Sequence, residues 1–182
     1  AKGIDGFRCD MAEMVPHEFW KYATEKVKVQ YPHIVFIGEV YDPNQYRTYI
    51  AAGFDYLYDK VGMYDCLRDV MCEHRSANDI TRQWQATDDI SKHVLYFLEN
   101  HDEQRIASNY FCGNMQKGIP ALIVAALFQC NPIMIYAGQE FGEKGMDGEG
   151  FSGIDGRSTI FDYWSIDAIR KGFFERSKLS AE

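Results

Sequence analysis

The sequence predicts an α/β fold in which parallel strands alternate with helices. Short runs rich in Val, Ile, Leu, Tyr and Phe recur along the 182-residue chain, and stretches with apolar residues at helical spacing lie between most of them. The composition, 46% hydrophobic and 25% charged, is that of a globular protein large enough for one core. Strands that alternate with helices pair parallel to one another, because each helix returns the chain to the edge where the previous strand began.

The first part of the chain is predicted to form a strand, a helix and two further strands. Residues 3–10, GIDGFRCD, form an apolar strand that ends in charged side chains. Pro16 begins a helix, which continues to Tyr31 because apolar residues recur there at intervals of four. The run HIVFIGEV, residues 33–40, is rich in β-branched residues and predicts a strand buried on both faces. Residues 54–59, FDYLYD, predict a weaker strand.

The rest of the chain continues this alternation. Two helical stretches, a strand, a helix, a strand and a last helix with Ser165 as its N-cap follow in this order: residues 67–71, 80–84, 93–102, 117–129, 131–138 and 165–177. The apolar run inside residues 117–129 is about half as long as a membrane span. We therefore predict a buried helix there, and no membrane partner.

The number of residues per unit favours a (β/α)₈ barrel. Five strands in 182 residues give about 36 residues per strand and helix, and eight such units need about 290, which is within the range of that fold. The chain is therefore predicted to be a single partial barrel domain over residues 1–182, with no second domain. A five-stranded doubly wound sheet is the competing fold, but no strand-to-helix turn carries the glycine pattern of a dinucleotide-binding or phosphate-binding loop.

Charge and cysteine content exclude several classes of partner. The net charge is -8, so the chain offers no broad basic surface for nucleic acid, and a neutral or cationic ligand is favoured. The five cysteines are odd in number, scattered and without the spacing of metal ligands. The sequence therefore predicts neither a disulfide framework nor a zinc site, and it assigns no cellular location.

Acidic side chains follow three of the predicted strands. Asp10 and Glu39 lie at the ends of two apolar strands, and His101 and Asp102 lie at the polar end of the predicted strand of residues 93–102. Because the active groups of parallel α/β folds lie at the carboxyl ends of strands, these side chains are predicted on one rim. Such a group of carboxylates suits metal-assisted chemistry or the hydrolysis of a glycosidic bond by a carboxylate pair.

Several short segments carry a resemblance to a known family. In order along the chain, GFRCD, GEVYD and ENHDEQR resemble the second, third and fourth conserved regions of the α-amylase family of retaining glycoside hydrolases (glycoside hydrolase family 13). IMIYAGQE resembles the eighth strand of that family's barrel, and FDYW, residues 161–164, resembles the segment after it. The resemblance implies that the chain covers strand four to helix eight of the catalytic barrel.

The resemblance also implies a role for each residue of the rim. It assigns catalysis and substrate binding to six side chains: catalytic Asp10, Glu39 and Asp102, and substrate-binding Arg8, His101 and Asn100. Asp10 is the implied nucleophile, Glu39 the general acid and then base, and Asp102 the third carboxylate. His101 would hydrogen-bond the sugar before the cleaved bond, and Arg8 would hold Asp10 ionised. The implied substrate is a starch-like α-glucan or a maltooligosaccharide.

Two departures from the family pattern bear on this expectation. Many starch-degrading members carry Lys-His after the nucleophile, where this sequence has Glu13-Met14. Strands one to three are not among these residues, so we expect either the missing barrel portion or a second copy to cover the open sheet edges. The chemistry needs no cofactor. The intact protein could hold a structural calcium, but the family's calcium site lies largely in that missing portion, and we assign no metal ligand.

Three alternative functions fit the same acids. A glucosyl or maltosyl transferase of the resembled family shares the covalent intermediate, with a sugar hydroxyl in place of water. A non-catalytic carbohydrate-binding module would share the fold, although lost chemistry should show as substitutions at the three carboxylates. A metal-dependent α/β enzyme would use the acids as ligands. The loop DGEGFSGID, residues 147–155, could then hold calcium, although it lacks the ligand spacing of a known loop motif.

Overall fold

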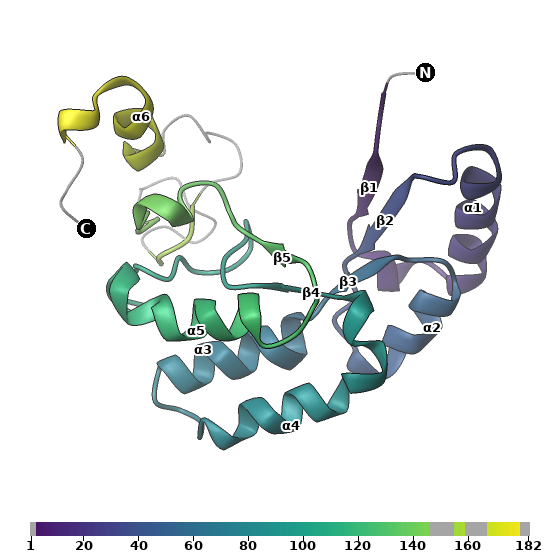
Figure 1. Cartoon of the computed structure of the whole chain (residues 1–182), viewed down its shortest axis with the longest axis horizontal. Coiled ribbons are helices and arrows are strands. Elements are labelled where there is room, and N and C mark those ends of the chain that lie inside the picture. Colours follow the sequence, from purple (N-terminus) through teal and green to yellow (C-terminus); the bar gives the residue numbers. More distant parts are fainter. Residues whose placement is uncertain (1–2, 146–154, 159–166, 179–182) are drawn as a thin grey trace. The chain divides into compact units, whose positions relative to one another are not determined.

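The computed structural model describes residues 3–145, 155–158 and 167–178, and Figure 1 shows their arrangement. The chain divides into two compact units. Unit 1 consists of Ala1–Cys66, Asn78–Tyr96 and Gln129–Ile133, and unit 2 consists of Leu67–Ala77, Phe97–Phe128 and Met134–Glu182. In the part that the structure describes, no helix is long and apolar enough to cross a membrane.

Five strands form one sheet in which neighbours follow the order of the sequence. The strands are β1 (Gly6–Cys9), β2 (Val35–Gly38), β3 (Tyr56–Tyr58), β4 (Val94–Phe97) and β5 (Ile133–Met134). The pairs β1–β2, β2–β3 and β3–β4 are parallel, which confirms the predicted α/β class. A doubly wound sheet reverses its strand order at a switch point, whereas this order never reverses. The doubly wound alternative is therefore wrong.

Helices connect the strands largely where the sequence predicted them. The helices are α1 (His17–Gln30), α2 (Tyr46–Ala51), α3 (Asp65–Met71), α4 (Asn78–Ala86), α5 (Met115–Leu127) and α6 (Asp167–Phe174). The short helix α2 was not predicted. The predicted N-cap of the last helix, Ser165, lies outside the described residues.

The prediction of a buried α5 is wrong for one of its faces. Gly118, Ala121 and Ala125 are buried, whereas Ile123 and Leu127 are exposed. Small side chains let the helix backbone approach its neighbours, and the larger apolar side chains lie on the opposite face. Burial on both faces is also wrong for β2, where Phe36 is buried and its neighbours Val35 and Ile37 are only half-buried. In β4, by contrast, every residue is buried.

Helix α1 is fixed to the connection between α2 and β3 by polar contacts. The buried Thr24 donates its hydroxyl hydrogen to the carbonyl of Ala52 at 2.7 Å. Lys28 Nζ donates to the carbonyl of Gly53 at 2.9 Å and forms an ion pair with Asp55 at 2.8 Å. Gly53 has a φ of +101°, and a Cβ there would lie 2.3 Å from Thr24 Oγ1, so only glycine fits. These contacts fix the connection that leads into β3 against α1.

Asp59, the residue directly after β3, carries a buried carboxyl group in unit 1. Tyr46 from α2 donates its hydroxyl hydrogen to Asp59 Oδ1 at 3.1 Å, and the π-helical turn Lys60–Tyr64 wraps around the side chain. A Cβ on Gly62 would lie only 2.1 Å from Asp59 Oδ1, which shows how closely the turn approaches. Burial raises the pKa of Asp59 to about 6, against the opposing effect of hydrogen bonds from Met63, Tyr46 and Gly62.

This raised pKa predicts a pH-dependent effect of Asp59→Asn. Between the ordinary pKa of an aspartate and about 6, the folded chain binds more protons than the unfolded chain, so the free energy of unfolding falls as pH rises. Asparagine does not titrate, so this fall in the free energy of unfolding is absent from the variant. Its side-chain oxygen still accepts the hydroxyl of Tyr46. We expect the stability of the variant, relative to the unmodified chain, to improve by about 2 to 3 kcal/mol from pH 4 to pH 7.

Urea unfolding at a series of pH values measures this difference. The matched control is Asp88→Asn, an exposed aspartate, whose relative stability should stay flat over the same range. If the stability of Asp59→Asn relative to the unmodified chain also stayed constant with pH, the prediction would be wrong.

Candidate active site

The first part of the candidate site lies where β1 and β2 end. The two strands pair in register from Gly6 with Val35 to Cys9 with Gly38. The backbone N–H of Glu39 then donates to the carbonyl of Cys9 at 3.1 Å. Asp10 and Glu39 therefore follow two aligned strand ends at the same edge of the sheet. A Cβ on Gly38 would lie 2.9 Å from Phe54 and Leu57, so packing beneath this edge requires glycine immediately before Glu39.

Arg8 bridges the two acids. Its Nη1 donates to Asp10 Oδ1, and its Nη2 lies 3.2 Å from Glu39 Oε1. The guanidinium carbon also lies 5.3 Å from the ring centroid of Tyr58. Burial alone lowers the pKa of Arg8, but hydrogen bonds to Tyr58 and Asp10 and the charge of Glu39 outweigh it and raise that pKa. A permanent positive charge therefore stands between the carboxylates.

The two acids differ in environment. The side chain of Asp10 is 75% exposed, whereas that of Glu39 is 5% exposed. Glu39 accepts the backbone N–H of Met11 on Oε2 at 2.8 Å and the hydroxyl of Tyr41 on Oε1 at 2.9 Å. Met11 has a φ of 46°, in the left-handed region, and thus turns the chain sharply after Asp10. An accessible carboxylate therefore stands beside one that is buried and held on both oxygens.

A second cluster follows β4 and belongs to unit 2. Asn100 is buried, and its Oδ1 accepts the backbone N–H groups of Asp102 at 2.8 Å and Glu103 at 2.9 Å. This turn places His101 Nε2 3.2 Å from Asp102 Oδ2. The side chains of His101 and Asp102 are 30% and 37% exposed, so both are open to a ligand.

A buried ion pair anchors the loop that carries this second cluster. Arg105 Nη1 lies 2.8 Å from Glu99 Oε2, and Arg105 Nε donates to Ser158 Oγ at 2.8 Å. The guanidinium stacks 4.1 Å from the ring centroid of Tyr136, and the N–H of Ile106 donates to Glu99 Oε1 at 2.8 Å. Burial raises the pKa of Glu99, and the charge and hydrogen bond of Arg105 oppose that shift. This ion pair was not predicted from the sequence.

The structure thus gathers the rim residues of the sequence analysis into two groups. In unit 1 Arg8 contacts both Asp10 and Glu39, and in unit 2 Asp102 contacts both His101 and Asn100. Their catalytic and binding roles stay predictions. The contacts of Met11 and Tyr41 with Glu39 were missed, because they depend on the pairing of β1 with β2 and on the turn after each strand.

Metal ligands do not gather in the described part of the chain. No three His, Cys, Asp or Glu side chains within residues 3–145, 155–158 and 167–178 are placed to hold an ion. The loop of residues 147–155 lies outside the described residues, except for Asp155. The FDYW segment, residues 161–164, also lies outside them.

Comparison with protein families and curated proteins gives consistent matches. The family model of the alpha amylase catalytic domain matches residues 1–180. An intracellular maltogenic amylase of Bacillus subtilis is 26% identical over 150 residues, which are 80% of this chain and 25% of that protein. Alpha-amylase MalA of Haloarcula japonica is 31% identical over 148 residues, 78% of this chain and 21% of that protein. The chain spans about a quarter of the length of these relatives.

Solved structures agree in fold. A cyclic α-maltosyl-(1→6)-maltose hydrolase from Arthrobacter globiformis in complex with maltose matches 91% of this chain and 37% of its own, with a TM-score of 0.68 and 19% identity. An α-amylase from Lactobacillus plantarum matches 75% of this chain and 35% of its own, with a TM-score of 0.60 and 25% identity. The predicted partial barrel is thereby confirmed. The chain belongs to the α-amylase family and forms part of its (β/α)₈ catalytic barrel.

Proposed function

We propose that these residues supply the catalytic carboxylates of a retaining glycoside hydrolase that cleaves α-glucosidic bonds in starch-like glucans or maltooligosaccharides. The observation that carries the proposal is the arginine bridge between the exposed Asp10 and the buried Glu39. A retaining enzyme needs one ionised nucleophile beside one carboxyl group that exchanges a proton. Arg8 holds the two carboxyl groups beside each other, and Asp10 is the one that is open to a substrate.

In the first step Glu39 gives its proton to the glycosidic oxygen while Asp10 attacks the anomeric carbon. The bond to the leaving sugar breaks, and an ester forms between Asp10 and the remaining sugar. In the second step Glu39 takes a proton from water, the water oxygen attacks the anomeric carbon, and Asp10 leaves as a carboxylate. We assign Asp102 and His101 to hydrogen bonds with sugar hydroxyls, with Asn100 holding their turn.

The names of the relatives support the substrate class. Curated proteins similar to this chain are called maltogenic amylase and neopullulanase. Glucosyl or maltosyl transfer would use the same ester with a sugar hydroxyl in place of water. The names amylase and neopullulanase are those of hydrolases, and we therefore propose hydrolysis.

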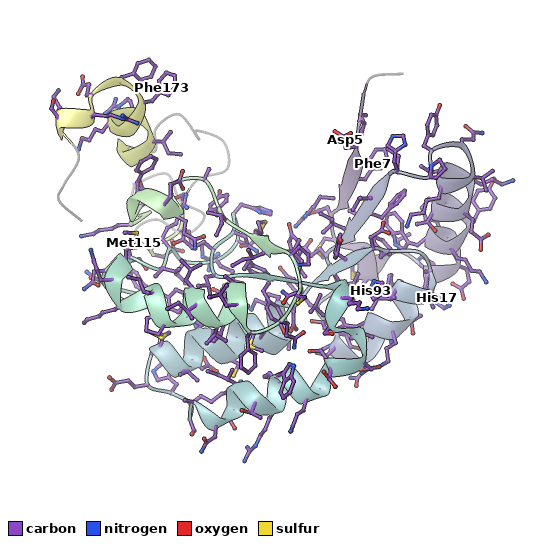
Figure 2. The ribbon with its side chains drawn as sticks, viewed as in Figure 1. Asp5, Phe7, His17, His93, Met115 and Phe173 are labelled. Carbon is purple, nitrogen blue, oxygen red and sulfur yellow. The ribbon has the colours of Figure 1, made fainter. Side chains whose placement is uncertain are left out.

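The free edge of β1 supports a partner that completes the barrel. β1 stands first in the strand order, and in the described part of the chain no strand pairs with its other edge. A groove of about 600 Å³ lies beside it, and its apolar lining includes Ile4, Phe7, Val27, Tyr31 and Ile34. Figure 2 labels Phe7 on β1, where its side chain is 44% exposed. We propose that a further strand and helix of the barrel cover this edge and groove.

Covalent labelling tests the proposed mechanism. The natural polypeptide that contains these residues is incubated with a fluorinated maltosyl fluoride, which slows hydrolysis of the ester, and its peptides are analysed by mass spectrometry. We expect the label on Asp10 and none on Asp10→Asn. The matched control is Asp5→Asn, an exposed aspartate just before β1, which should keep the label. A label on any other residue would overturn the proposal.

A further inference from the structure

Glu13 joins the segment after β1 to the segment after β2. It lies in a short 3₁₀ turn, Ala12–Met14, that follows Asp10. Its Oε2 accepts the backbone N–H groups of Tyr41 at 2.9 Å and Asp42 at 3.0 Å. One carboxylate therefore holds two successive peptide groups that lie 28 and 29 residues further along the chain. We call this pair of contacts the Glu13 clamp.

The turn that carries Glu13 is itself supported from α2. The hydroxyl of Tyr49 donates to the carbonyl of Glu13 at 3.2 Å and to that of Val15 at 3.0 Å. Tyr49 is buried, so its position is fixed by packing. The indole N–H of Trp20 donates to the carbonyl of Ala12 at 2.9 Å. The carboxylate of Glu13 therefore projects from a backbone segment that is held on both sides.

Tyr41 contacts both Glu13 and Glu39 and so connects them. Its backbone N–H is held by Glu13, and its hydroxyl donates to Glu39 Oε1 at 2.9 Å. The ammonium of Lys60 lies 5.9 Å from the centroid of the Tyr41 ring, and an ion pair of 3.0 Å with Asp65 holds that ammonium in turn. All of these residues belong to unit 1. The ring of Tyr41 is thus held at its backbone and at its face while its hydroxyl reaches Glu39.

We propose that Glu13 and Tyr41 are positioning residues for the general acid, Glu13 by fixing the backbone of Tyr41 and Tyr41 by orienting the carboxyl group of Glu39. This inference rests on the proposed role of Glu39. As the proton leaves Glu39 for the glycosidic oxygen, negative charge grows on its carboxylate, and the hydroxyl of Tyr41 is already aimed at it. The hydrogen bond therefore strengthens in the transition state, which is the condition for an effect on rate.

Tyr41→Phe in the natural polypeptide tests the inference, because phenylalanine keeps the ring and removes only the hydroxyl. The measured quantity is kcat/KM, which reports the steps up to the covalent ester. For a maltooligosaccharide, whose leaving sugar needs a proton, we expect a fall of about tenfold or more. For maltosyl fluoride, whose leaving group needs no proton, we expect a change of less than about twofold. A purely structural role would lower both values together.

Two variants of Glu13 extend the test to the clamp. Glu13→Ala removes both acceptor contacts and should show the same selective loss on the maltooligosaccharide. Glu13→Gln keeps an oxygen that accepts the N–H groups of Tyr41 and Asp42 and should recover most of the activity. The matched control is Tyr22→Phe, at an exposed tyrosine on α1, which should leave kcat/KM unchanged for both substrates.

Glu39→Gln separates failure of this inference from failure of the proposed function. If Glu39→Gln spares the maltooligosaccharide, Glu39 is not the acid, and both the function and the inference are wrong. Suppose that Glu39→Gln shows the selective loss, but that Tyr41→Phe lowers kcat/KM equally for both substrates or for neither. Then only the inference is overturned. Selective loss in Glu39→Gln, Tyr41→Phe and Glu13→Ala, with recovery in Glu13→Gln, supports it.

Discussion

Replacement of Asp10 by alanine is expected to lower maltooligosaccharide hydrolysis by the natural polypeptide about a thousandfold or more, since no oxygen is left to attack the anomeric carbon. Asp10 is the exposed member of the pair, so its loss opens space on the solvent side of Arg8 and leaves the contacts of Glu39 with Met11 and Tyr41 in place. The variant should therefore fold normally and still protonate a leaving group.

Azide provides the decisive measurement for this variant. A small external anion can enter the space left by Asp10 and attack an activated maltosyl fluoride directly, which gives a single displacement and a glycosyl azide of inverted configuration. Recovery of turnover with added azide, with the inverted product identified by nuclear magnetic resonance, is the expected result. Asp5→Ala serves as the control and should need no azide. Activity of Asp10→Ala within tenfold of the unmodified polypeptide would show that another group is the nucleophile.

Local patterns were sufficient for the strands and for most helices. The runs before Glu39 and before Glu99 are rich in β-branched, aromatic and leucine side chains, and both form strands. Helix α2 was missed because Tyr46–Ala51 has only six residues, several of them β-branched or aromatic. Its stability comes from tertiary contacts, since Tyr46 and Tyr49 are buried and donate to partners elsewhere in the chain. No window of the sequence contains that information.

The candidate site was predictable to the same extent. Arg8 and Asp10 are two residues apart in the predicted strand of residues 3–10, so the sequence spacing alone predicts their contact. The bridge to Glu39 requires the parallel register of β1 with β2, which the sequence does not specify. Helix periodicity likewise could not show that α5 buries its small residues, because an apolar run has no polar face to set its orientation. Composition predicts that such a helix packs, but not which side packs.

Replacement of Arg105 by methionine is expected to destabilise unit 2 by about 3 to 5 kcal/mol at neutral pH, because it leaves Glu99 buried without a cation. The variant also loses the donor to Ser158 and the stacking contact with Tyr136. Burial already raises the pKa of Glu99, and removal of Arg105 takes away the charge that opposes this shift. A carboxyl group whose pKa is higher in the folded state favours folding at low pH and loses that contribution as pH rises.

The loss of stability in Arg105→Met, relative to the unmodified chain, should therefore be smallest in acid and largest near neutral pH. Hydrogen exchange at the amide of Ile106, which donates to Glu99 Oε1 at 2.8 Å, reads the opening of this loop directly. The double variant Glu99→Gln with Arg105→Met removes the uncompensated charge and should recover much of the protection at neutral pH, with little dependence on pH. The matched control is Arg82→Met, an arginine on α4 whose side chain is exposed, and it should exchange like the unmodified chain. If the single and double variants of the buried pair exchanged equally fast at neutral pH, lost packing of the arginine, and not the charge left on Glu99, would account for the instability.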